Sequence, residues 1–175
     1  GVTHCLLKHG ARLVYALGSG WGYRGPDKDR PAFDYTVWAQ SGLMDSLGEP
    51  DSLPVSCRPG LGDHFTAITL AYGIMLALYH RERTGEGQFV HASLYGCLLD
   101  MGAVSLAAHL GTGEEAGRRS RKEMGNPLWN FYQTRDGQCV QFAMTQSERH
   151  WEDFCKALGM EHLQHDPRFD THAHR

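Results

Sequence analysis

Two glycine-bearing segments of this 175-residue chain surround residue types that could do chemistry. The first, residues 20–25, reads Gly-Trp-Gly-Tyr-Arg-Gly and has the G-x-G-x-x-G spacing of dinucleotide-binding loops. That motif requires a helix to begin among the glycines, whereas Pro26 and Pro31 bracket a charged stretch that cannot form one. The sequence therefore disfavours a dinucleotide site, although the glycines still allow a ligand or another backbone segment to approach closely.

The second segment, Gly60-Leu61-Gly62-Asp63, places a carboxylate where a long apolar stretch begins. The local sequence favours Asp63 as the N-cap of a helix. A second interpretation is nucleophilic, because two glycines leave space around the carboxylate and the positive end of the helix favours its negative charge. The two interpretations are compatible, since a carboxylate that caps a helix with one oxygen has a second oxygen free.

Other reactive side chains give weaker signals. Four histidines surround a segment expected to turn, where a solvated surface is favoured over a metal site: His162, His165, His172 and His174. Five widely spaced cysteines form no C-x-x-C pair, and they indicate a reducing, cytoplasmic location: Cys5, Cys57, Cys97, Cys139 and Cys155. Neither a metal site nor a disulfide framework is expected.

The elements that must position these residues alternate between strand and helix. Breaker-rich residues 18–31 form a loop between the first strand and the first helix, and residues 63–82 read as a helix apolar nearly all round and hence buried. The expected order is strand 12–18, helix 34–47, helix 63–82, strand 88–92 and helix 94–109, the last capped by Ser93. This order predicts an α/β fold for residues 1–110.

A second unit is expected after a change of composition. Residues 111–126 are polar, charged and rich in glycine, which is typical of a linker between domains. Beyond it, two alternating segments flank Asp136-Gly137 and predict a β-hairpin, followed by an amphipathic helix over residues 147–158. Residues 127–175 therefore read as the start of a smaller α+β domain.

Composition and charge limit the class of partner. With 17 Lys and Arg against 20 Asp and Glu, the net charge is −3, which does not favour nucleic-acid binding. The longest charge-free apolar run, residues 70–79, is shorter than the roughly 18 residues of a membrane-spanning helix, so no membrane partner is expected. The chain starts without Met and reads as an internal piece of a longer protein.

Several short segments together point to one family. They are Gly20-Trp21-Gly22 with Gly25-Pro26, Arg30-Pro31-Ala32-Phe33-Asp34, Ser41-Gly42-Leu43-Met44, Gly62-Asp63, Arg81-x-x-Thr84-Gly85-x-Gly87-Gln88, Tyr132-x-Thr134-x-Asp136-Gly137 and Asp166-Pro167-Arg168-Phe169. In their order and spacing they resemble the class III CoA-transferases, the family of formyl-CoA transferase, carnitine CoA-transferase and α-methylacyl-CoA racemase. The resemblance covers nearly the whole chain, which looks like the middle portion of a full member.

The resemblance implies a Rossmann-like large domain, a smaller α+β domain and an interlocked homodimer that acts on acyl-CoA and carboxylic acids. It places the catalytic aspartate at Asp63, which would attack the thioester and form a mixed anhydride. It places coenzyme A beside the loop and the start of the following helix, at Gly20, Gly22, Arg30, Phe33 and Asp34. Coenzyme A is then a substrate, and no covalently bound cofactor is implied.

Two departures separate this chain from particular members of the family. The racemases carry a histidine where this chain has Phe33, and phenylalanine cannot carry a proton, so two-base racemisation is disfavoured. The glycine run of the formyl-CoA type is missing after Gly117, which weakens formyl or oxalyl specificity. The alternatives are an acyl-CoA racemase or isomerase of the same family and a truncated, catalytically inert CoA-binding fragment.

Overall fold

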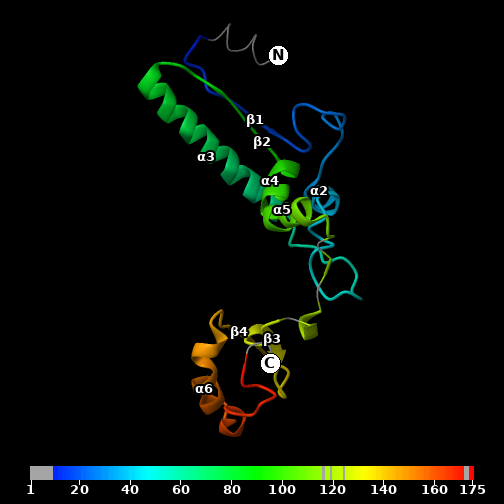
Figure 1. Ribbon diagram of the computed structural model, residues 1–175. Helices are drawn as coiled ribbons and strands as arrows, with labels where there is room; N and C mark the ends of the chain where they lie inside the picture. Colours follow the sequence, from blue (N-terminus) through cyan, green and yellow to red (C-terminus); the bar gives the residue numbers. More distant parts are fainter. Residues whose placement is uncertain (1–9, 116, 119, 124, 172–173) are drawn as a thin grey trace. The chain divides into compact units, whose positions relative to one another are not determined.

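The computed structural model separates the chain into two units, which fall within residues 1–118 and 119–175 (Figure 1). The residues that it describes are 10–115, 117–118, 120–123, 125–171 and 174–175. The division lies inside the segment expected to be a linker. Each unit is a mixed α/β structure with its own small core, and each is described by itself.

The first unit is built on a parallel strand pair. Strand β1 (Tyr15–Ser19) pairs in parallel with β2 (Phe89–Ser93), with Tyr15 opposite Phe89 and Ser19 opposite Ser93. Parallel neighbours require a long crossover, and the chain supplies helix α2 (Asp34–Gln40) and helix α3 (Leu61–Thr84) between them. The predicted alternation of strand and helix is confirmed for this unit.

Helix α3 is bounded by glycines at both ends. Gly60 precedes it with φ of +84°, and Gly85 follows it with φ of +81° and donates its backbone N–H to the carbonyl of Arg81. These left-handed conformations favour glycine and stop the helix without strain. The helix is therefore two residues longer at each end than the predicted range of 63–82.

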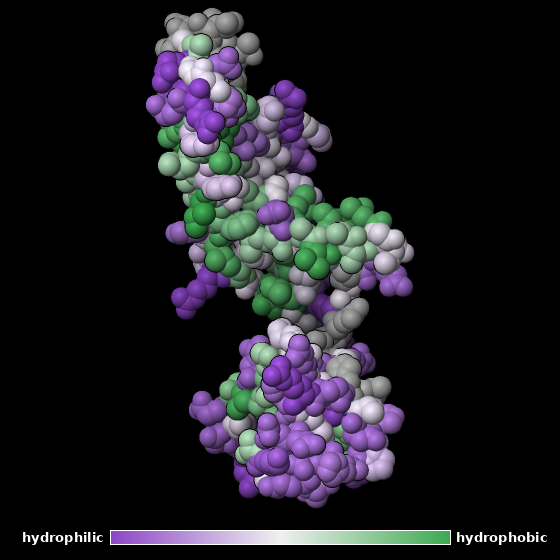
Figure 2. Space-filling model, turned by 60° about the vertical axis from the view of Figure 1, so that its left-hand side comes forward, coloured by the Kyte–Doolittle hydropathy of each residue, from purple (hydrophilic) through white to green (hydrophobic). Residues whose placement is uncertain are grey.

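The expectation that α3 is buried is wrong for this chain. Its contacts with β1, β2, α2 and α4 leave one side without a covering element among the described residues of the unit. Large side chains on α3 are exposed: Leu61, Ile68, Tyr72, Met75, Leu76 and Tyr79. Figure 2 shows hydrophobic residues gathered on the surface of the first unit, as expected for a helix that the sequence makes apolar all round.

The length and composition of α3 would also suffice for a membrane span, since 18 consecutive residues have a mean hydropathy of 1.3. The charge-free run in the sequence understates this length, because the helix continues on both sides of it. Core helices of globular proteins reach the same values, and α3 contacts both strands of the parallel pair. Those contacts are typical of a helix that covers a sheet.

Two other predicted helices are shorter than expected. The predicted helix 94–109 is broken at Gly102 into α4 (Leu94–Met101) and α5 (Ala103–Thr112), whose axes are bent by 72°. The predicted helix 34–47 stops as α2 at Gln40, because Gly42 has φ of +80° and turns the chain. The Ser93 cap is confirmed, since its hydroxyl accepts the N–H of Gly96 at 3.1 Å.

The core of the first unit lies where α2 meets α4. Val37 and Leu98 are fully buried and Trp38 is nearly so. Partly buried apolar residues pack around them: Trp21, Ala32, Leu43, Met44, Cys57, Leu94 and Tyr95. Trp21 and Ala32 belong to the loop after β1 and to its return toward α2, so this core also fixes both ends of that loop.

The second unit contains the predicted hairpin and helix. Strand β3 (Trp129–Gln133) pairs antiparallel with β4 (Cys139–Ala143), and Gly137 in the turn has φ of +82°. Helix α6 (Ser147–Ala157) follows, and two short 3₁₀ turns lie at Arg121–Glu123 and Glu161–Leu163. The core consists of Leu128, Trp151 and Cys155. The hairpin and the amphipathic helix are confirmed.

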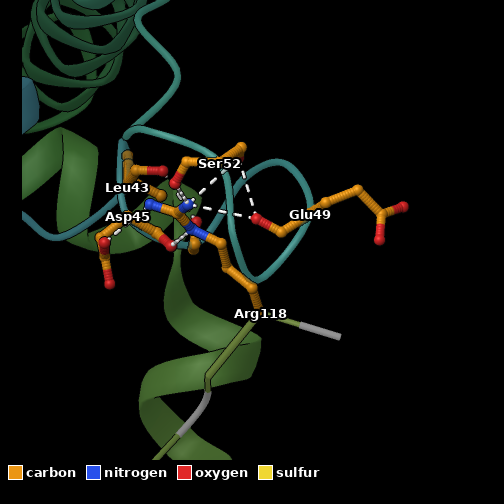
Figure 3. A network of polar contacts seen from close by, with 6 residues as sticks. Leu43, Asp45, Glu49, Ser52 and Arg118 are labelled. Atoms are coloured by element: carbon orange, nitrogen blue, oxygen red, sulfur yellow. Dashed lines mark hydrogen bonds and ion pairs between the residues drawn. The ribbon is translucent and has the colours of Figure 1, made fainter. Parts of the chain in front are cut away.

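Arg118 closes the long loop between α2 and α3 (Figure 3). Its guanidinium, with 8% of the side chain exposed, pairs with the Asp45 carboxylate at 2.8 Å and donates to the Asp45 carbonyl at 2.7 Å. It also donates to the carbonyls of Glu49 and Ser52 and to the Ser52 hydroxyl. One planar cation thus holds three points of the loop, which a lysine ammonium could not do with the same geometry.

We expect Arg118→Ala to lower the free energy of unfolding by about 2 kcal/mol, because several charge-assisted hydrogen bonds of one side chain are lost together. Urea unfolding followed by tryptophan fluorescence measures the change. Arg58→Ala removes an exposed arginine and is the matched control, with an expected change within about 0.5 kcal/mol. Equal stability of the two variants would show that the loop does not depend on Arg118.

Candidate functional site

The loop after β1 folds back on itself, and Gly20 makes this possible. A Cβ at Gly20 would overlap the Cβ of Ala32, so the two ends of the loop approach closer than any side chain allows. The Gly20 carbonyl accepts the N–H of Tyr95 at 2.9 Å. The indole N–H of Trp21 donates to the Pro31 carbonyl at 3.2 Å. Gly20 therefore serves close backbone packing in this structure.

Arg30 and Gly22 belong to the same loop. The Arg30 guanidinium lies over the Trp21 ring at 4.8 Å and faces the Asp27 carboxylate at 3.8 Å. Gly22 has φ of +110° and donates its N–H to the Ser19 hydroxyl at 3.1 Å. One loop, which starts at the carboxyl end of β1, thus contains three predicted ligand-binding residues: Gly20, Gly22 and Arg30.

Phe33 lies at the surface directly before α2. It is 72% exposed, and Thr36 fixes its backbone by accepting the Phe33 N–H at 3.0 Å and donating to the Phe33 carbonyl at 2.8 Å. The backbone of Phe33 is therefore held in place, while its aromatic ring is exposed and accessible to a ligand. Its chemistry allows apolar or stacking contacts and no proton transfer.

Asp34 is buried at the first position of α2, with 9% exposure. Its Oδ2 accepts the backbone N–H of Gly60 at 2.6 Å. A Cβ at Gly62 would overlap Oδ1 of Asp34 and would lie 2.9 Å from Nε1 of Trp38. The carboxylate therefore packs directly against the first turn of α3.

Asp63 is the third residue of α3, and its side chain is exposed. The expected N-cap role is wrong, because Gly60 occupies the N-cap position and the Gly60 N–H goes to Asp34. The first turn of a helix presents unpaired N–H groups and a partial positive charge, which favours a carboxylate there. Asp63 is thus an accessible carboxylate at the positive end of a long helix.

The site therefore consists of two parts within the first unit. Residues Gly20, Gly22 and Arg30 lie in the loop after β1, while Asp34 and Asp63 are linked through Gly60 at the start of α3. Among the residues that the structure describes, no group of three or more histidine, cysteine or acidic side chains is placed to hold a metal ion. His172 lies outside the described residues.

Sequence reasoning missed a polar pair beside the loop. The Ser19 hydroxyl and Nε2 of His91 lie 2.8 Å apart, and the Tyr23 ring packs against the imidazole with a centroid distance of 4.7 Å. Ser19 and His91 lie on paired strands. A parallel alignment of the two predicted strands would therefore have placed these two residues near each other. The pair joins β2 to Gly22 through Ser19, and so it supports the loop.

Comparison with known proteins shows the family to which the chain belongs. The model of CoA-transferase family III matches residues 4–175, and the chain belongs to this family. A crystal structure of a CaiB/BaiF family protein from Brucella suis has a TM-score of 0.82 and 27% identity, over 98% of this chain and 45% of that one.

Two curated relatives bear CoA-transferase names. Cinnamoyl-CoA:phenyllactate CoA-transferase of Clostridium sporogenes is 36% identical over 91% of this chain and 39% of its own length. (R)-2-hydroxy-4-methylpentanoate CoA-transferase of Clostridioides difficile is 32% identical over 91% of this chain and 40% of its own length. The chain thus spans about 40% of the length of the curated relatives it matches.

Burial lowers the pKa of His91 below its ordinary value of 6.5, and so favours the neutral ring in the folded state. A lowered pKa in the folded state contributes stability that is complete above pH 6.5 and is lost as the pH falls through the folded pKa. We expect wild-type protein to lose stability between pH 7.5 and 5 relative to His91→Gln, which cannot gain a proton. Thermal unfolding of both proteins across this range measures the difference, and parallel curves would contradict it.

Proposed function

We propose that the protein carrying this chain is a CoA-transferase that moves coenzyme A between an acyl-CoA thioester and a free carboxylic acid, with Asp63 as nucleophile. The observation that carries the proposal is the exposed Asp63 carboxylate in the first turn of α3, in a chain of CoA-transferase family III. Relatives from two clostridial species that bear CoA-transferase names support the same reaction class.

The chemistry requires a carboxylate nucleophile. An Asp63 oxygen attacks the thioester carbonyl, the C–S bond breaks, and a mixed anhydride and the CoA thiolate are formed. The acceptor carboxylate then replaces the donor acid, and the thiolate attacks the new acyl carbon, which restores Asp63. Both anhydrides are sensitive to water, so the reaction also requires oxyanion donors and exclusion of solvent.

The binding residues follow from the same proposal. Coenzyme A would lie along the loop at Gly20, Gly22 and Arg30 and reach Phe33 at the start of α2. Phe33 is exposed and fixed by Thr36, which suits an apolar contact with the substrate. It cannot serve as the second base of a racemase. The transferase is therefore favoured over the racemase.

The exposed apolar residues of α3 support an interlocked homodimer. In α5, Val104 and Leu110 are 87% and 75% exposed, and α3 presents Ile68, Tyr72 and Met75. Apolar surfaces of this kind are covered by other parts of a protein or by a partner. The first unit would be part of a Rossmann-like large domain, the second the start of the small domain, and the remaining cover would come from the rest of the enzyme and its second subunit.

We expect Asp63→Asn to reduce turnover about a thousandfold or more, since the nucleophilic oxygen is lost while the residue size is kept. Protein from the complete reading frame is incubated with a panel of CoA thioesters and carboxylic acids, and product formation is measured. Mass spectrometry detects an acyl or CoA adduct on the peptide that contains Asp63. Asp51→Asn, an exposed aspartate in the preceding loop, is the matched control and should keep wild-type turnover.

Two results would overturn this assignment. One is full turnover of Asp63→Asn, with the adduct still formed elsewhere. The other is exchange of the α-proton of a 2-methylacyl-CoA with deuterated solvent at an enzymatic rate, which would support the racemase. If the reading frame ends with this chain and the protein binds acyl-CoA without turnover, the chain is a catalytically inert CoA-binding fragment.

We expect the protein to be a dimer in sedimentation velocity and Met75→Lys to weaken the association, because it places a charge on the exposed apolar side of α3. Met75 is 63% exposed, so the folded subunit should tolerate the change. Glu86→Lys, at an exposed position after the helix, is the control and should associate like wild type. A monodisperse monomer that binds no hydrophobic dye would exclude the dimer.

A further inference from the structure

The buried carboxylate of Asp34 is in contact with the start of the helix that carries Asp63. Asp34 belongs to α2, and its hydrogen bond to the Gly60 N–H joins two segments that are 26 residues apart in sequence. The distance of 2.6 Å is short, as in hydrogen bonds that an ionised acceptor strengthens. The carboxylate of a residue expected to touch coenzyme A thus accepts a hydrogen bond from the protein backbone.

Gly60 is the point at which the loop turns into α3. Its left-handed backbone, with φ of +84°, sets the direction in which the first turn leaves the loop. His64 adds a second bond at this point, with Nδ1 at 2.7 Å from the Gly60 carbonyl. Asp63 follows three residues after Gly60, so the backbone orientation at Gly60 sets the position of the turn that carries Asp63.

Neighbouring groups pack closely around the Asp34 carboxylate. Its Oδ1 is buried without a hydrogen-bond partner among the described residues, and it occupies space that a side chain at Gly62 would need. Trp38 and Leu98 close the same space from α2 and α4. Besides burial, the charge of Asp34 raises the pKa of the Cys57 thiol, as expected of an anion close to it.

From this geometry we infer that Asp34 is a positioning residue for Asp63: it holds Gly60 and the first turn of α3 in place instead of binding the substrate. The inference rests on the proposed function, because it assigns Asp34 a role in that same site. A nucleophile displaced by about 1 Å can lose about a hundredfold in rate, so a fixed first turn matters for kcat. The affinity for acyl-CoA depends on other residues and should not change.

The kinetic test compares Asp34→Asn with Asp34→Ala. The Asn amide oxygen can still accept the Gly60 N–H, so this variant should keep kcat within about tenfold of wild type, whereas Ala should lose about a hundredfold. The KM for acyl-CoA should stay within about twofold in both variants. Gly62→Ala displaces the carboxylate from the other side and should lower kcat as Asp34→Ala does, without adding to it in the double variant.

A second measurement does not depend on activity. Amide hydrogen exchange should show that Gly60 and the first turn of α3 lose protection in Asp34→Ala and regain it in Asp34→Asn, while the last turns of α3 remain as in wild type. Amide hydrogen exchange can be measured in the folded protein whatever reaction it catalyses. Failure of the transferase proposal, seen as no turnover and no Asp63 adduct in wild type, is thereby distinguished from failure of the positioning role.

Three results would overturn the inference. A large rise in KM with unchanged kcat in Asp34→Ala would assign Asp34 to substrate binding. If Asp34→Ala kept the wild-type kcat per folded molecule but had a lower melting temperature, Asp34 would have a structural role only. Unchanged exchange at Gly60 in Asp34→Ala would show that the hydrogen bond does not hold the first turn of α3.

Discussion

The fit between the Asp34 carboxylate and the first turn of α3 is the constraint on which the arrangement of the first unit depends. Three requirements meet at this point: the Gly60 N–H must find an acceptor, Gly62 must have no side chain, and the carboxylate must remain buried. These requirements satisfy one another, because the Gly60 N–H donor compensates for the lost hydration of the Asp34 carboxylate and Gly62 leaves the space that the carboxylate occupies. The core of Val37, Trp38 and Leu98 packs beside this contact and keeps water from it.

Helix α3 connects this well-packed end to a surface with far fewer internal contacts. Burial is concentrated at Gly62, Thr66 and Ala77, where small residues allow close approach of neighbouring elements. The large apolar residues along the other side are mostly exposed, and that surface suits association with further protein. Helix α3 is therefore well packed near Asp63, whereas the apolar surface along the rest of the helix is of the kind that further protein structure covers.

How much the sequence predicts depends on whether the signal is local. Gly85 marks the end of α3 to within a few residues, and the hairpin follows from Asp136-Gly137 between alternating strands, so both were predictable. The break at Gly102 and the early end of α2 were not, because apolar spacing continues through both points. Of the site, the position of Asp63 near a helix start was predictable, but its N-cap role was wrong, because the helix begins at Leu61 with Gly60 as its N-cap. The contact that holds Gly60 comes from Asp34, 26 residues away, and no local signal shows it.

Glycines in a suspected ligand loop need a structural test before a ligand is assigned to them. Gly20 and Gly62 both lie where another part of the protein fills the space of a side chain, namely Ala32 in one case and Asp34 in the other. Sequence spacing cannot distinguish such internal contacts from contacts with coenzyme A, because both require a missing Cβ. In this chain the glycines first bring the loop and the helix to their positions. The side chains of Arg30, Phe33 and Asp63 remain exposed and are accessible to a ligand.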